Sequence, residues 1–348
     1  NRGVVVPVEI PNRYGVKMRA TLFAPKETAK RRGRAKRTAL PAVIVLNGGQ
    51  GTQEALWAHL QGLAEAGYVA LGLDVQGDGR TANLPPDPDP STTDVNESEF
   101  CRPGAWQEPQ EMGIRELHAC AGQRPPDADP TTGPLGAPGY YQASTTTQQP
   151  DYSQLDAGYT PHVARKVFGA LDAVKWLLSA DNPLRAKIHP DRIGLMGHSL
   201  GAQGALVAGN GDPLERFAAV VSLDGFGKMA PYARPRVPTL FLQHEIDMGL
   251  PKHHRPDDTI TPSYRAAQAF RAANVPTMLV TPDGSTHLDF QFLSYPVIWP
   301  LATAAAACPE CVAAVNASRD GERVSLHYTT AWFDRYLKQD RSAERRLL

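Results

Sequence analysis

Runs of apolar residues recur along the chain, and the segments between several of them have helical spacing. Short apolar or alternating runs rich in Val, Ile and Leu are typical of strands. They predict eight strands, at residues 4–10, 16–24, 40–49, 68–75, 192–198, 217–225, 239–247 and 277–284.

Helical spacing is clearest in residues 54–67, which end at Gly67, and in residues 162–180. In the second segment Val163, Val167 and Leu171 fall on one face, and residues 329–340 predict a closing helix. Because strands and helices alternate, we expect an α/β fold. Its sheet should be mostly parallel and twisted, with about eight strands and helices on both faces.

The chain of 348 residues is 42% apolar, which is enough to bury a full core. We expect one domain, residues 1–348. Residues 79–160 break the pattern, because they contain 12 of the 31 prolines and only one plausible helix, residues 108–120. We interpret them as a long proline-rich insertion that acts as a lid or covers one edge of the sheet.

Charge and hydropathy narrow the choice of partners. The 36 basic and 36 acidic side chains cancel, so no overall field attracts nucleic acid. The basic segment 26–37 has no interleaved aromatic residues and is interpreted as a solvated hairpin loop. The longest apolar stretch, residues 301–315, is too short and not hydrophobic enough to span a membrane.

The four cysteines bear on the compartment. Four cysteines allow three pairings, and Cys101 with Cys120 or Cys308 with Cys311 would close short local loops. This favours a secreted or periplasmic protein. The alternative is a redox or zinc pair in "CPEC", but zinc usually needs two such pairs, and the surrounding alanine-rich segment does not resemble a thioredoxin-like junction.

The segment "GLMGHSLGAQG" surrounds Ser199 with glycines where a predicted strand meets a predicted helix. A chain that reverses within about two residues brings neighbouring Cβ atoms into collision, and Gly197 and Gly201 remove those collisions. Such a turn raises the serine hydroxyl above the sheet and directs helix N–H groups at the group it attacks. We therefore predict Ser199 to be a nucleophile.

A serine hydroxyl needs a base, and the base needs a carboxylate to fix its tautomer. The order expected on this architecture is serine, acid, histidine. Asp247 ends the seventh predicted strand and His287 follows the eighth, so both should lie at the same sheet edge as Ser199. Glu245 competes with Asp247 for the acid role, since both point to one face if the strand continues.

The other histidines are weaker candidates. His198 precedes the nucleophile and at most lines the pocket, and His244 falls within a predicted strand. His253 and His254 accompany Asp257 and Asp258 in a polar loop without regular spacing, so we expect a solvated loop and no metal site.

An acyl-transfer site also needs donors for the oxyanion. The backbone N–H of Leu200 is one, and the loop "LNGGQGT" should supply the other from Gly49, with Gln50 as the alternative. This loop lacks the GxxxxGK[ST] pattern of a phosphate-binding loop, and no lysine is near it in the sequence.

Together, "GHSLG", the acid in "HEID", the histidine in "GSTH", "LDVQGDG" and "AWFDRYL" resemble the α/β-hydrolase superfamily. The chain is most similar to secreted esterases of the dienelactone-hydrolase-like and cutinase-like (polyester hydrolase) branch. The resemblance implies a Ser199, Asp247, His287 triad, an acyl-enzyme intermediate, no cofactor, and hydrolysis of small or polymeric carboxylic esters. The loop "NGGQG" and residues 79–160 depart from the pattern of those relatives.

Two other functions remain open at this point. The same triad would serve a peptidase or amidase, and a hydrolase scaffold without activity would serve as a binding protein. Trp106 and either Tyr140 or Tyr141 are candidates for lining the substrate pocket, although each is more often a packing residue.

Overall fold

The computed structural model describes thirteen parts of the chain. These are residues 3–12, 16–26, 39–48, 51–76, 78–81, 159–211, 214–225, 235–244, 262–283, 285, 287, 289–291 and 321–348. The four cysteines, Trp106, Tyr140, Tyr141 and the helix expected at 108–120 lie outside them, as does most of the proline-rich insertion.

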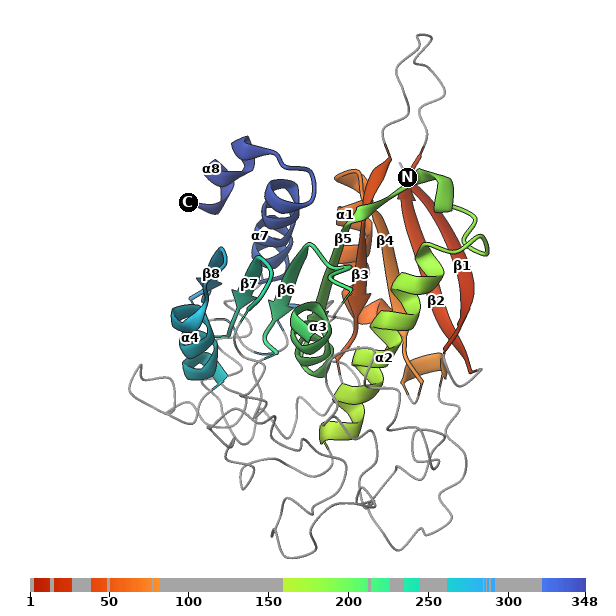
Figure 1. Ribbon diagram of the computed structural model, residues 1–348. Helices are drawn as coiled ribbons and strands as arrows, with labels where there is room; N and C mark the ends of the chain where they lie inside the picture. The colour runs from red at the N-terminus through yellow and green to blue at the C-terminus, as the bar shows by residue number, and fades with distance from the viewer. Residues whose placement is uncertain are drawn as a thin grey trace, which may run out of the picture.

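One mixed, mostly parallel sheet of eight strands organises the fold (Figure 1). Its spatial order is β1-β2-β4-β3-β5-β6-β7-β8; β1 and β2 are antiparallel, β2 pairs antiparallel with β4, and all later pairs are parallel. The strands are β1 Gly3–Pro11, β2 Lys17–Pro25, β3 Leu40–Leu46, β4 Val69–Asp74, β5 Ile188–His198, β6 Ala219–Leu223, β7 Thr239–Leu242 and β8 Thr277–Val280. The carboxyl ends of the six parallel strands therefore share one edge.

Helices cover both faces of this sheet (Figure 1). On one face lie α2 Tyr159–Leu177, α3 Leu200–Gly211 and α4 Pro262–Ala272. On the other lie α1 Trp57–Glu65 and α7 Gly321–Tyr336. Short elements complete the described chain: η1 Gln53–Leu56, η2 Gly79–Thr81, η7 Arg185–Lys187, η9 Arg341–Ala343 and α8 Glu344–Leu347.

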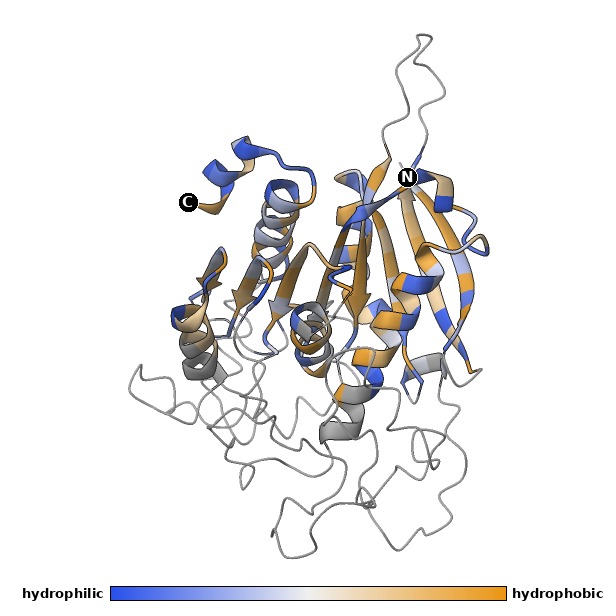
Figure 2. Ribbon diagram, in the orientation of Figure 1, coloured by the Kyte–Doolittle hydropathy of each residue, from blue (hydrophilic) through white to orange (hydrophobic). Residues whose placement is uncertain are grey.

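The central strands are apolar on both faces because both faces are covered. Every residue of β4 is buried, as is every residue of β3 after Leu40. Figure 2 shows the consequence, with hydrophobic colour along the middle strands and hydrophilic residues on the outer sides of the helices. The continuous apolar runs in the sequence thus reflect a buried parallel sheet.

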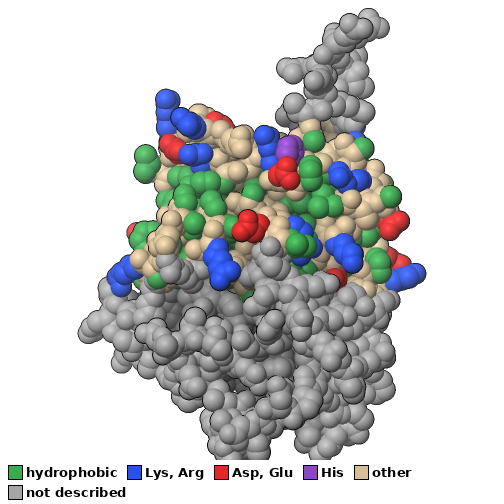
Figure 3. Space-filling model, in the orientation of Figure 1, with side chains coloured by type: hydrophobic (Ala, Val, Ile, Leu, Met, Phe, Trp, Pro, Cys, Tyr) green, Lys and Arg blue, Asp and Glu red, His purple; other side chains and the backbone are tan. Residues whose placement is uncertain are grey.

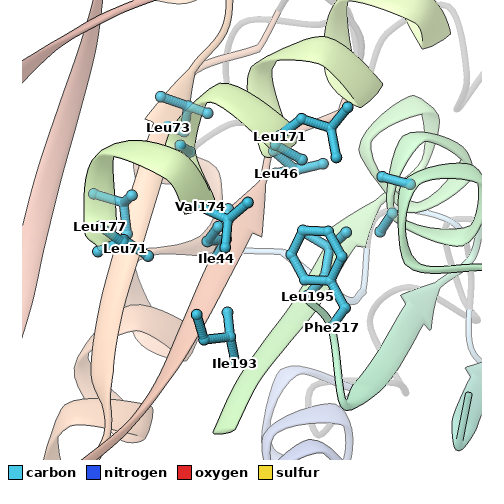
Figure 4. Packing of buried hydrophobic residues seen from close by; sticks show 14 of the residues in the cluster. Ile44, Leu46, Leu71, Leu73, Leu171, Val174, Leu177, Ile193, Leu195 and Phe217 are labelled. Carbon is cyan, nitrogen blue, oxygen red and sulfur yellow. The ribbon is translucent and has the colours of Figure 1, made fainter. Parts of the chain in front are cut away.

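Helix α2 packs across the centre of the sheet (Figure 4). Leu171, Val174 and Leu177 point from α2 onto Ile44 and Leu46 of β3 and the neighbouring strands. On the opposite face Phe333 of α7 lies so close to Gly194 of β5 that a Cβ there would sit 2.6 Å from its ring. The two helix layers therefore enclose the centre of the sheet, including β5, the strand that leads to Ser199.

The expected α/β class with a mostly parallel eight-stranded sheet is confirmed, but several strands end before the predicted residue, including β3 at Leu46, β6 at Leu223, β7 at Leu242 and β8 at Val280. We expected the seventh strand to run to residue 247 with His244 inside it; β7 ends at Leu242, so His244 follows the strand. The described residues show that the regular pairing of β7 stops where its apolar character stops, although the Gln243 N–H still donates to the Val280 carbonyl at 2.9 Å.

The surface of the described part of the chain carries mixed charge. In Figure 3, Lys and Arg side chains are scattered over the visible face with Asp and Glu among them, and they do not gather into one patch. Among the described helices, none combines the length and the hydrophobicity needed to cross a bilayer.

Truncating the core should cost more than truncating the edge strand. Ile44 is fully buried in β3, so Ile44→Ala should lower the free energy of unfolding by about 2 to 5 kcal/mol. Val5 in β1 is 49% exposed, and Val5→Ala should change it by about 0.5 kcal/mol or less. Urea unfolding of both variants measures the difference, and equal losses would contradict this packing.

Candidate functional site

Ser199 stands in a strained turn between β5 and α3. Its φ is 54°, a left-handed conformation that is rare for a residue with a side chain. A Cβ at Gly197 would lie 2.3 Å from the Gly201 carbonyl oxygen, and one at Gly201 would lie 2.2 Å from the Asn47 carbonyl oxygen. Only glycine fits at both positions, which is why the sequence places glycines around the serine.

Hydrogen bonds hold this turn against the next strand and the next helix. The Ser199 backbone N–H donates to the Leu223 carbonyl at 3.0 Å, and the Ser199 carbonyl accepts from the N–H groups of Ala202 and Gln203. In the sheet, His198 pairs with Leu223. The residues one step beyond, Ser199 and Asp224, therefore leave adjacent strands side by side.

His287, in the segment after β8, contacts both of these residues. Its Nε2 lies 3.0 Å from Ser199 Oγ, and its Nδ1 is hydrogen-bonded to Oδ2 of Asp224. Because an ionised carboxylate only accepts hydrogen bonds, Nδ1 carries the proton and Nε2 has a free lone pair toward the hydroxyl. This is the arrangement that a base needs to remove the serine proton.

Asp224 is buried and accepts three hydrogen bonds. Two come from His244, through its Nδ1 to Oδ2 and through its backbone N–H to Oδ1 at 3.3 Å, and one comes from His287. Burial alone would raise the pKa of this carboxyl, but the nearby His287 and the two imidazole hydrogen bonds outweigh it. The pKa of Asp224 lies below its usual range, so the group stays ionised.

The carboxylate beside His287 is thus one that the sequence analysis did not single out. Asp247, which we expected there, and its competitor Glu245 lie outside the described residues. Asp224 fell inside the predicted strand at residues 217–225, whereas β6 ends at Leu223. The available signal was its place directly after an apolar strand, matching the place of Ser199 after the strand before it.

The loop after β3 reaches the turn at Ser199. A Cβ at Gly48 would lie 3.4 Å from Ser199 Cβ and 3.3 Å from Nδ1 of His198. Gly49 and Gln50, the expected donors of this loop, lie outside the described residues. Leu200 is the first residue of α3, where a backbone N–H has no acceptor within the helix.

A buried lysine holds the start of this loop. Lys166 of α2 donates to Asn47 Oδ1 at 2.8 Å and to the Gly48 carbonyl at 3.2 Å, and it forms an ion pair with Asp78. Burial lowers its pKa, while Asp78 favours the charged form. The sequence places no lysine near the loop, yet the tertiary structure does. Three protein acceptors surround this ammonium, so it is not available to a phosphate.

Three side chains could also hold a metal ion. One ligand atom each from Asp224, His244 and His287 lies within 4.8 Å of the others, the one such group among the residues described. Both imidazoles, however, donate Nδ1–H protons to Asp224 here, and a metal ligand needs those nitrogens deprotonated. The cluster therefore fits a hydrogen-bonded carboxylate better. His253, His254, Asp257 and Asp258 lie outside the described part.

No family model matches the sequence, and no curated protein is significantly similar to it. The chemical interpretation of this site therefore depends on its own geometry.

Because α3 approaches β3 closely at Gly201, we expect any side chain at this position to destabilise the fold. Gly201→Ala would force a Cβ against two backbone carbonyl oxygens, those of Asn47 and Leu46, and should lower the free energy of unfolding by about 1 to 3 kcal/mol. Gly62→Ala in α1 is the matched control, because its Cβ meets only the side chain of Leu326, which can move. Urea unfolding should find the control within about 1 kcal/mol of the parent chain; a neutral Gly201→Ala would contradict the packing.

Proposed function

We propose that this chain is a serine hydrolase of the α/β-hydrolase fold that cleaves carboxylic esters through an acyl-enzyme. One observation carries the proposal: Ser199 Oγ lies 3.0 Å from His287 Nε2, while Nδ1 of the same ring is bonded to the buried Asp224. A nucleophile, a base and a carboxylate that orients the base are the parts that acyl transfer requires. Here the proposed acid is Asp224 in place of Asp247.

In the first half of the reaction, His287 Nε2 takes the Ser199 proton as Oγ attacks the ester carbonyl. Asp224 stabilises the imidazolium that forms, without taking its proton. His287 then returns the proton to the leaving alcohol, which leaves the acyl group on Ser199. Water then attacks the acyl-enzyme while His287 takes its proton. His287 returns that proton to Ser199 Oγ, and the carboxylic acid product is released.

The oxyanion of each tetrahedral intermediate needs donors close to Ser199. Leu200 N–H is well suited, since it opens α3 and the partial positive charge of the helix N-terminus lies there. A second donor from the loop after β3, at Gly49, stays a prediction. Lys166 and Asn47 support this proposal by holding the start of that loop beside the nucleophile.

The fold is consistent with this assignment. The serine follows β5 and the histidine follows β8, both at the edge where the parallel strands end. In open α/β sheets, ligands bind outside the carboxyl ends of the strands. The sequence resemblance to secreted dienelactone-hydrolase-like and cutinase-like esterases points to the same chemistry, and the substrate is then a small or polymeric ester.

An amidase or peptidase would use the same three side chains, so matched ester and amide substrates decide between them. Faster turnover of the amide would replace the ester proposal. A binding protein without activity would leave Ser199 unlabelled by a fluorophosphonate in the folded protein.

Removing the nucleophile should abolish hydrolysis. With a series of p-nitrophenyl esters of increasing acyl length, Ser199→Ala should lose on the order of 10⁶-fold in kcat, because no hydroxyl remains to form the acyl-enzyme. A fluorophosphonate should label the parent chain at Ser199 and leave the variant unlabelled. An active Ser199→Ala variant would refute the mechanism, and the series also reports the depth of the acyl pocket.

Substitutions at two aspartates test which carboxylate orients His287: Asp224, as proposed from the structure, or Asp247, as expected from the sequence. Asp224→Asn should lower kcat by about 10⁴-fold, because the amide no longer holds His287 in the tautomer with Nδ1–H. Asp247→Asn, the matched control, should stay within about threefold of the parent chain. Steady-state kinetics on one ester measures both, and the reverse ranking would return the acid role to Asp247.

A further inference from the structure

The proposed base, His287, lies in the segment after β8, a strand that is not adjacent to β5. β8 lies three strands from β5 in the sheet, and strands are spaced about 4.8 Å apart, so the two are separated by roughly 14 Å. The segment after β8 must return across the ends of β7 and β6 before His287 can meet Ser199. Contacts at the end of that path have to hold it there.

His198, the last residue of β5, makes such a contact with the main chain of His287. Its Nε2 lies 2.8 Å from the His287 carbonyl oxygen, and the two imidazole rings lie 4.6 Å apart at 35°. The side chain of His287 is held separately, by Asp224 at the end of β6. The bond from His198 thus links the end of β5 to the backbone that carries the proposed base.

The chemistry of this contact fixes the state of His198. A carbonyl oxygen can only accept, so Nε2 of His198 carries a proton. Burial, together with the nearby His287, lowers the pKa of His198 to about 3, which keeps the ring neutral at neutral pH. A neutral donor holds the backbone without repelling the imidazolium that His287 becomes during the reaction.

We propose that His198 is a positioning residue, whose Nε2–H anchors the His287 main chain so that the His287 ring stays within reach of Ser199 Oγ. This rests on the proposed function and extends it, since His198 was expected only to line the pocket. Both proton transfers pass through His287 Nε2, so a displaced base slows each of them. Substrate binding does not use this bond, and KM should change little.

Three substitutions at one position test the role of the donor. Glutamine can place an amide N–H where Nε2 of histidine lies, so His198→Gln should keep kcat within about threefold. Asparagine carries the same amide one methylene shorter and cannot reach, and leucine has no donor. His198→Asn and His198→Leu should both lose about 10- to 100-fold in kcat, with KM within about threefold, since a displacement of about 1 Å at a reacting group costs up to about 100-fold.

The measurement is ester hydrolysis per active site, with sites counted by fluorophosphonate titration so that unfolded protein is excluded. A His198→Asn or His198→Leu variant as fast as the parent chain would overturn the proposal, and so would a His198→Gln variant as slow as the other two. A parent chain that neither hydrolyses esters nor reacts with the probe would instead overturn the proposed function. The two failures are therefore distinguishable.

Discussion

The reversal of the chain at Ser199 is the constraint on which the site depends. It forces α3 against the end of β3, because the Cα of Gly201 lies where any Cβ would strike the carbonyl oxygens of Leu46 and Asn47. This contact brings three things to one place: the serine hydroxyl, the first N–H groups of α3, and the loop that leaves β3. The strain of a left-handed serine is tolerated because the flanking sheet and helix leave the turn no alternative path.

Polar side chains at the ends of three neighbouring strands surround His287, which lies in the segment after β8. His198 is the last residue of β5, Asp224 directly follows β6, and His244 lies two residues after the end of β7. On the other side, Lys166 and Asp78 form a buried ion pair next to Asn47 and Gly48. Buried charges are tolerated when they are paired and hydrogen-bonded, and both Asp224 and Lys166 meet that condition. The result is a rigid setting for the hydrogen bond between Ser199 and His287.

Much of the fold could be read from local patterns. The alternation of apolar strands with helices such as residues 162–180 was enough to predict a mostly parallel sheet. The end of β7 was missed, because polar residues 243–247 could continue a strand or leave it, and only pairing with neighbours decides. The role of Lys166 was also missed, since 118 residues separate it from Gly48 and no sequence pattern links the two.

The sequence by itself determined the fold class and the turn at Ser199, because both follow from interactions between residues that are close along the chain. Gly197 and Gly201 are required because any Cβ at either position would collide with neighbouring atoms of the turn, and the sequence pattern alone indicates this. The tertiary structure alone decided which carboxylate meets His287. That choice depends on strand order and register: β6 lies beside β5, its pairing puts Asp224 level with Ser199, and the imidazole from the far side of β7 is hydrogen-bonded to that carboxylate.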